Sequence, residues 1–167
     1  MKNKKQRRQI AGLIIALMVV LVGGVVFMGA VSGWFGASKI VLGDEYHCRD
    51  QDCDGDNFLE LRADEYDNLV NAKKSFVVFV DKDGCVTASK MREFIIEYID
   101  KNNIRFYRIA YEDMKESLLH NKIKYYPSVA IVSNGNVVAW LRSDSDDDTE
   151  KYNNREALIN WLDTYLK

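Results

Sequence analysis

The pattern of apolar and polar residues changes near residue 39. Residues 10–31 form 22 consecutive uncharged and mostly apolar positions, whereas the later residues place apolar side chains in short runs and periodic sets between charged ones. An apolar run of about 20 residues matches the hydrocarbon core of a bilayer, and the apolar region of a secretory signal is usually shorter, about 7–15 residues. We therefore predict a transmembrane helix at 10–31, with cleavage as a signal peptide as the alternative.

The charges beside this span predict its orientation. Residues 1–9 hold five basic residues and no acidic one, and positively charged flanks stay on the cytoplasmic side of a membrane. We expect a single-pass protein of the cell membrane, with a cytoplasmic basic tail and an extracytoplasmic C-terminal part. Residues 32–57 become polar and acidic toward their end, and we interpret them as an extracytoplasmic linker.

Beyond the linker, strand-like and helix-like patterns alternate. The continuous β-branched and aromatic run at 75–81 is typical of a strand buried on both faces. The strongest helix signal has apolar residues at the spacing i, i+3, i+4, i+7 and i+8, namely Met91, Phe94, Ile95, Tyr98 and Ile99. Further strands are predicted at 58–61 and 104–110, and further helices at 63–74, 112–120 and 154–166.

Two apolar runs within 127–141 are joined by Asn134 and Gly135. This dipeptide favours a type I′ hairpin turn, which needs a positive φ at both central residues. The complete order is βαβαβαββα. Because βαβ units give parallel strands and a hairpin adds an antiparallel edge, we predict an α/β sandwich at 58–167 with a mixed central sheet and helices on both faces.

The charge balance limits the classes of partner. Five of the 23 basic residues precede the span, so 18 basic residues stand against all 25 acidic ones in the outer part, which carries about −7. This charge argues against nucleic acid or an anionic lipid surface as the main partner. The sequence also shows no Ser/His/Asp arrangement and no phosphate-binding glycine loop.

Three features together resemble the thioredoxin family. They are the order of elements, a cysteine between the buried strand and the amphipathic helix, and the segment IKYYPSVAIVSNGNVVAWL at 123–141. In that family an I-x-x-x-P-[ST] segment leads into the final hairpin, and Ile123, Pro127 and Ser128 match it. The resemblance covers residues 58–167 and implies a thioredoxin-like fold there.

The resemblance also implies roles for particular residues. Cys85 stands in the place of the family's nucleophile, just before a helix whose N-terminus favours the thiolate, although Asp81 and Asp83 act against it. Tyr126 and Pro127 would border a site for an extended peptide, and the peptide bond between them would be cis.

The cysteine site departs from the family's pattern in two places. The family's second cysteine would fall at Ala88, so the motif holds no thiol that could resolve a mixed disulfide formed at Cys85. The buried acid that the family tends to keep six residues before the nucleophile is replaced by Phe79. Cys85 is therefore either a single reactive thiol or a small residue in a tight loop.

The other two cysteines lie close together in the linker. Cys48 and Cys53 are separated by four residues, and in an oxidising compartment we expect them to form a disulfide that leaves Cys85 unpaired. Two alternatives remain at this point. The pair could supply the missing resolving thiol to Cys85, or the three cysteines could bind zinc with His47.

The same stretch contains a possible weak calcium loop. Asp50, Asp52 and Asp54, followed by Gly55, match the first ligands and the glycine of such a loop. Position twelve is Leu61 rather than an acid. A solvated acidic linker is the alternative, and no other cofactor is expected.

Two functions from different classes follow from these features. The first is an extracytoplasmic protein that acts on thiols or disulfides of exported proteins through Cys85, with an external thiol to resolve it. The second is a non-catalytic module that binds exported polypeptides or a membrane partner. The sequence names no substrate and predicts no oligomeric state.

Overall fold

The computed structural model describes residues 39–48 and 58–166. The predicted transmembrane segment at 10–31 lies outside these residues. Within the two described ranges, no helix is both long enough and apolar enough to cross a membrane. The compact unit that contains the described residues begins at Lys39.

The elements of this unit follow the predicted order, with short helices added. The strands are β1 (Phe58–Leu61), β2 (Phe76–Asp81), β3 (Phe106–Ala110), β4 (Ser128–Ser133) and β5 (Asn136–Trp140). The α-helices are α2 (Ala63–Asn71), α3 (Val86–Asn102), α4 (Tyr111–Glu116), α5 (Thr149–Asn153) and α6 (Arg155–Tyr165). Three single-turn 3₁₀ helices lie at Asp44–Tyr46, Leu118–Asn121 and Asp146–Asp148.

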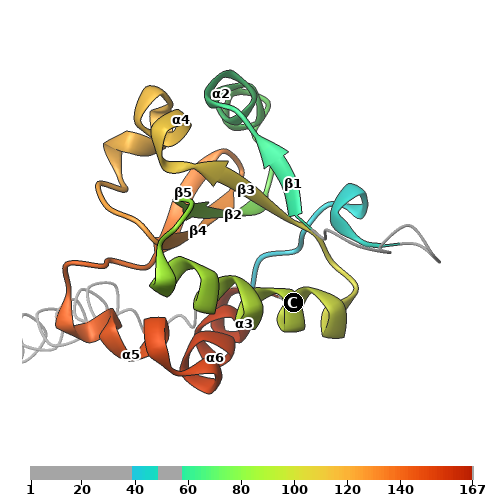
Figure 1. The fold of residues 1–167 in the computed structure, drawn as a ribbon. Coiled ribbons are helices and arrows are strands. Elements are labelled where there is room, and N and C mark those ends of the chain that lie inside the picture. The colour runs from blue at the N-terminus through green and yellow to red at the C-terminus, as the bar shows by residue number, and fades with distance from the viewer. Residues whose placement is uncertain (1–38, 49–57, 167) are drawn as a thin grey trace, which may run out of the picture. The chain divides into compact units, whose positions relative to one another are not determined.

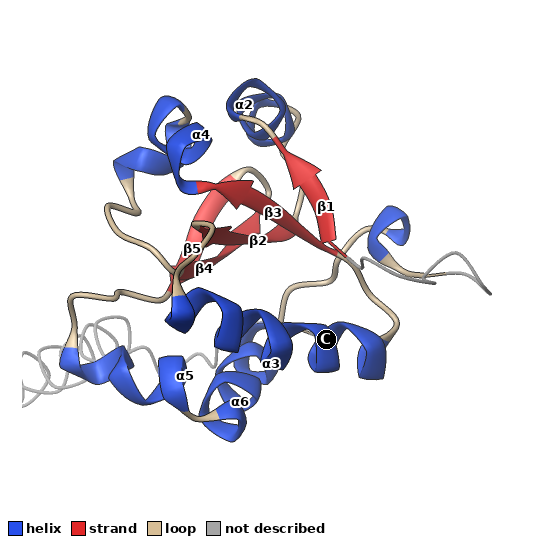
Figure 2. Cartoon of the chain, viewed as in Figure 1, coloured by secondary structure: helices blue, strands red, loops and turns tan. Residues whose placement is uncertain are grey.

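The strands form one mixed five-stranded sheet in the order β1-β3-β2-β4-β5. β1 and β2 run parallel to β3, whereas β4 is antiparallel to β2 and β5 is antiparallel to β4. In Figure 1, α2 and α4 lie on one side of the sheet and α3, α5 and α6 lie on the other. Figure 2 shows the same three layers, with the strands in red between helices in blue. The predicted α/β architecture with a mixed central sheet is confirmed.

Local sequence signals explain several of these elements. The hairpin between β4 and β5 turns at Asn134 and Gly135, which both have positive φ, at 49° and 74°. A Cβ atom at Gly135 would lie 2.3 Å from the carbonyl oxygen of Val70, so a close backbone approach also requires glycine there. α6 begins where the Asn154 side chain accepts hydrogen bonds from the backbone N–H groups of its first turn.

The predicted helix at 112–120 is wrong in one respect, because it is two shorter helices. The backbone is extended at Ser117, with φ −100° and ψ 167°. Its hydroxyl donates to the carbonyl oxygen of Met114 and accepts from the N–H of Leu119. A serine that bonds to neighbouring backbone groups competes with the helical pattern, so α4 ends and a 3₁₀ turn begins.

The boundary predicted for the linker is also corrected. The side chains of Ile40, Leu42 and Tyr46 are buried in the same core as the sheet. Ile40 forms a parallel β-bridge with Leu166, and His47 forms an antiparallel one with Ile104. Because these apolar side chains find partners on the domain, the described part of the linker, residues 39–48, belongs to it.

Four tyrosines in the core predict how stability depends on alkaline pH. Burial raises the pKa values of Tyr46, Tyr66, Tyr98 and Tyr152 above the ordinary value. Above pH of about 10, these tyrosines lose protons in the unfolded chain but keep them in the folded one. The unfolded state then binds fewer protons, so the free energy of unfolding falls by up to about 1.4 kcal/mol per pH unit for each tyrosine.

Chemical denaturation of residues 39–167 at a series of pH values from about 8 to about 11 measures this slope. Tyr66→Phe should make the slope shallower, because phenylalanine has no proton to lose. The exposed Tyr125 gives the matched control, and Tyr125→Phe should leave the slope unchanged. An identical slope in the Tyr66→Phe variant would contradict the prediction.

Candidate functional site

Cys85 lies at the N-cap of α3, directly after the loop that leaves β2. It is half-buried and free. The turn that carries it has Gly84 at φ 77° and a hydrogen bond from the N–H of Cys85 to the carbonyl oxygen of Lys82. The first turn of α3 contains no acidic residue. The thiol therefore sits where unpaired backbone N–H groups and the helix dipole favour a negative charge.

The sheet brings the loop of Cys85 next to the segment that holds Tyr126 and Pro127. Val80 pairs with Ser128 in the antiparallel register of β2 and β4, so the residues after β2 and those before β4 lie at the same edge of the sheet. The Tyr126–Pro127 bond is cis, as the resemblance implies. The loop and the segment also touch, because the Lys82 ammonium lies 5.5 Å from the centre of the Tyr126 ring.

A cluster of aromatic rings and charges surrounds this contact. The rings of Tyr111 and Tyr126 have centroids 4.5 Å apart. Lys82 also donates to Glu112 at 3.1 Å, and that hydrogen bond raises the pKa of the lysine. A second hydrogen bond, from Lys115, is the main cause of a lowered pKa at Glu112. Lys82 therefore keeps its positive charge beside the loop of Cys85 across the neutral range.

An ionic network centred on one buried carboxylate lies at the same loop, and the sequence did not reveal it. Asp81 at the end of β2 is fully buried and accepts hydrogen bonds from Arg92 on α3 and from Nε of Arg108 on β3, the latter at 3.0 Å. Arg108 also donates to Glu60 at 2.8 Å and to Asp83 at 3.0 Å. Burial alone would lower the pKa of Arg108, but the hydrogen bonds to Asp81 and Glu60 outweigh it and raise the pKa above its ordinary range.

This network fixes both ends of the loop. Arg108 contacts Asp81, the last residue of β2, and Asp83, which lies two residues before Cys85. From the sequence alone, Asp81 and Asp83 are expected only to act against the thiolate as negative charges. In the structure, both are paired with arginine. Sequence reasoning missed the network because it depends on the strand register. Phe79 pairs with Arg108 across the two strands. Phe79 and Asp81 are two residues apart and therefore share one face of β2, so Arg108 lies on the same face as Asp81.

The two positions that depart from the family's pattern are both in the core. Ala88 is 1% exposed and Phe79 is fully buried. The Phe79 ring packs against Phe58 with centroids 5.8 Å apart. Neither side chain can carry a proton or a thiol, so within the described part of the chain these two positions add no acid–base or redox group to Cys85.

The remaining predicted residues are placed only in part. Cys48 is disulfide-bonded, whereas Cys53 lies outside the described residues, so its pairing with Cys48 stays a prediction. Asp50, Asp52 and Asp54 lie outside them too, and the calcium loop stays a prediction. Among residues 39–48 and 58–166, no group of three or more His, Cys, Asp or Glu side chains is arranged to hold a metal ion.

No protein-family model matches the chain, and no curated protein matches it by sequence. Solved structures that resemble it include thioredoxin f2 from Chlamydomonas reinhardtii, with 20% identity over 62% of this chain and 94% of that protein at a TM-score of 0.46. A thioredoxin variant from Halobacterium salinarum has 14% identity over 68% of this chain and 95% of that protein, at a TM-score of 0.47. Mitochondrial thioredoxin 3 from Saccharomyces cerevisiae has 16% identity over 64% of this chain and 93% of that protein, at a TM-score of 0.46.

These structures are similar to the chain but are too distant for its function to be taken from them. The fold is visible in the chain's own topology. A mixed sheet in the order β1-β3-β2-β4-β5 lies between two layers of helices, with Cys85 after β2 and Pro127 before β4. The described domain has a thioredoxin-like α/β fold.

Proposed function

We propose that the protein acts on thiols and disulfides of exported proteins, with Cys85 as its single nucleophile. One observation carries the proposal. Cys85 is a free, half-buried cysteine at the N-terminus of α3, in a loop whose Lys82 contacts the ring of Tyr126. A partly exposed thiol near positive charge and a helix N-terminus is the setting in which cysteines become reactive.

The proposed reaction is thiol–disulfide exchange. The Cys85 thiolate attacks one sulfur of a substrate disulfide, so that a bond from Cys85 to the substrate forms and the substrate S–S bond breaks. The departing substrate thiolate takes up a proton. A thiolate from outside the chain then attacks the substrate sulfur of the mixed disulfide and releases the thiolate of Cys85. The electrons balance, because one disulfide is exchanged for another.

The proposed function also includes a location for the protein in the cell. The uncharged segment 10–31 would anchor the chain in the cell membrane, and the basic residues 1–9 would keep the N-terminus in the cytoplasm. The domain would then face the compartment in which disulfides form and persist. Its substrates would be exported proteins or peptides.

A second candidate function is a binding module without redox chemistry. It is favoured by Ala88, a buried methyl group at the place where a second thiol would be needed for a self-contained dithiol cycle. In that case the domain would hold an exported polypeptide or a membrane partner, and Cys85 would serve only as a small residue in the loop.

A trapping experiment separates the two functions. The full chain is incubated with a model peptide whose single cysteine is disulfide-bonded to a small alkyl thiol, so that the leaving thiol diffuses away, and adducts are located by mass spectrometry without reduction. Because Ala88 provides no resolving thiol, we expect a mixed disulfide at Cys85 that persists until an external thiol is added.

The control for this trapping moves the thiol elsewhere on the domain. In the variant Cys85→Ser with Thr164→Cys, an exposed thiol stands in the last turn of α6, where the helix dipole disfavours a thiolate, and we expect little adduct there. Equal adduct formation in both proteins, or none with the natural chain, would overturn the nucleophilic function and leave the binding module.

A further inference from the structure

A cavity of about 110 Å³ lies beside the segment that leads to Pro127. The ends of β2, β4 and β5 explain its position. Because β4 is antiparallel to both neighbours, the C-terminal ends of β2 and β5 lie at the same sheet edge as the N-terminal end of β4. The loop of Cys85, the segment with Pro127 and the cavity therefore share one edge of the domain.

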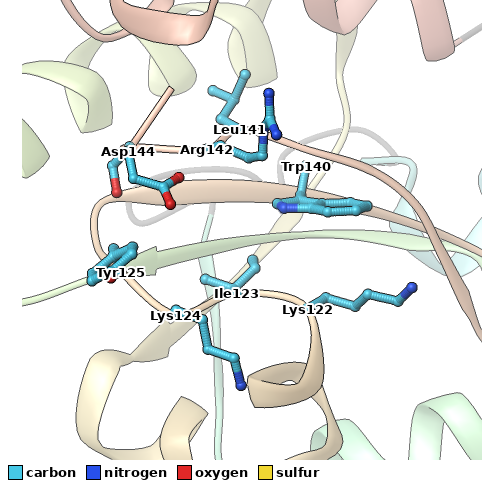
Figure 3. A pocket seen from close by; sticks show the side chains of 9 residues that line it. Lys122, Ile123, Lys124, Tyr125, Trp140, Leu141, Arg142 and Asp144 are labelled. Atoms are coloured by element: carbon cyan, nitrogen blue, oxygen red, sulfur yellow. The ribbon is translucent and has the colours of Figure 1, made fainter. Parts of the chain in front are cut away.

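Two segments form the walls of the cavity, and Figure 3 shows their side chains. One precedes Pro127 and the other follows β5. They are joined through the hydroxyl of Ser128, which donates to the carbonyl oxygen of Leu141 at 2.6 Å. The lining residues are Lys122, Ile123, Lys124, Tyr125, Trp140, Leu141, Arg142, Ser143 and Asp144.

Three basic side chains and one acidic one line this cavity, although the outer part of the chain is acidic overall and the backbone N–H of Arg142 donates to Asp148 at 2.8 Å. The Lys122 ammonium lies over the Trp140 ring, 5.6 Å from its centre, and Lys124 donates to the carbonyl oxygen of His120. Among residues 39–48 and 58–166, neither lysine forms an ion pair with a carboxylate. Arg142 donates to Ser145 at 2.9 Å and lies 3.9 Å from Asp147. Asp144 is the single acid in the lining.

The size and walls of the cavity favour one kind of ligand. At about 110 Å³ it is smaller than the ~300–1,000 Å³ of pockets that hold cofactors and other small molecules, yet larger than the ~10–15 Å³ that is needed to hold one water molecule. Tyr125 is 55% exposed, and the Trp140 ring lies next to Lys122 (Figure 3). An acidic side chain that enters from an extended segment would meet both the cations and these rings.

We propose that this cavity binds the carboxylate of an acidic side chain on a polypeptide that passes along the edge with Cys85 and Pro127. The protein would thereby select acidic segments of its partners. That these partners are exported polypeptides rests on the proposed function. The binding itself needs no reaction at Cys85.

The test uses the full chain in detergent micelles with Cys85→Ser, so that no covalent step contributes. The probe is a fluorescent extended peptide with two adjacent glutamates, compared with the same peptide carrying glutamines. We expect the glutamate peptide to bind on the order of five- to tenfold more tightly at low ionic strength, and the difference to shrink as salt is added. The double variant Lys122→Gln with Arg142→Gln should bind both peptides equally.

The control variant, Lys39→Gln with Lys101→Gln, removes two exposed lysines elsewhere on the domain and should keep the preference for glutamate. The exchange Lys122→Arg with Arg142→Lys should keep it too, which separates loss of charge from loss of folding. Equal affinity of the natural chain for the two peptides would overturn the proposal. Displacement of the glutamate peptide by an equal concentration of inorganic phosphate would also overturn it, because the site would then bind any small anion.

The peptide-binding test and the trapping test at Cys85 can succeed or fail independently. A preference for glutamate in a chain whose Cys85 forms no adduct would remove the redox function and leave the cavity as a binding site. An adduct at Cys85 without a preference for glutamate would support the redox function and overturn the proposed binding site for an acidic side chain.

Discussion

Replacing Asp81 by alanine is expected to lower the free energy of unfolding by about 3–5 kcal/mol, which is typical when one partner of a buried ion pair is removed. Asp81 is fully buried and accepts hydrogen bonds from both Arg92 and Arg108. Without it, Arg92 loses its carboxylate partner and Arg108 keeps only the more exposed carboxylates of Glu60 and Asp83. Chemical denaturation of residues 39–167, followed by circular dichroism, measures the change.

Asp83 provides the matched control for this prediction. Its side chain is 92% exposed and binds the same arginine, so Asp83→Ala should change the free energy of unfolding by less than about 0.5–1 kcal/mol. Asp81→Asn, which keeps the volume and removes the charge, should fall between the two alanine variants. A loss from Asp81→Ala no larger than that from Asp83→Ala would show that the network does not stabilise the fold.

Replacing Tyr46 by alanine is expected to cost about 3–5 kcal/mol, as for other large aromatic residues removed from a core. Tyr46 is 2% exposed and packs edge-on against Tyr107 with ring centroids 5.7 Å apart. Its carbonyl oxygen accepts from the N–H of Arg105. The result tests the corrected boundary of the domain, because a linker residue would have no such effect.

Val41 is the control in the same segment. Its side chain is 65% exposed, so Val41→Ala should change the free energy of unfolding by less than about 0.5 kcal/mol. Both variants can be compared by the denaturant concentration at the midpoint of unfolding. If Tyr46→Ala matched Val41→Ala, residues 39–48 would be a linker after all.

The architecture could be predicted because its signals are local. The buried run of β2 and the apolar spacing of α3 depend on neighbouring residues. Of the five residues with that spacing, the structure buries Met91, Ile95, Tyr98 and Ile99 and leaves Phe94 partly buried against the core. The turn at Asn134 and Gly135 is equally local, because backbone φ alone dictates the residue types.

The features that the sequence missed depend on contacts between distant residues. The network around Asp81 needs the register of three strands and the position of α3, which no short stretch specifies. Ile40, Val41 and Leu42 form a run of only three apolar residues beside an acidic stretch, which is too weak a signal to assign Ile40 and Leu42 to the core. The cavity near Pro127 likewise depends on Ser128 and Leu141, which lie 13 residues apart.

The reactivity of Cys85 tests the proposed function most directly. The rate of iodoacetamide alkylation at neutral pH is measured for Cys85 in the native full chain and in the same chain unfolded in urea, with peptide mapping by mass spectrometry. If Cys85 is a nucleophile that the N-terminus of α3 favours as a thiolate, it reacts faster in the native chain than in the unfolded one. A native rate equal to or below the unfolded rate would contradict this function and identify Cys85 as a structural residue of a binding module.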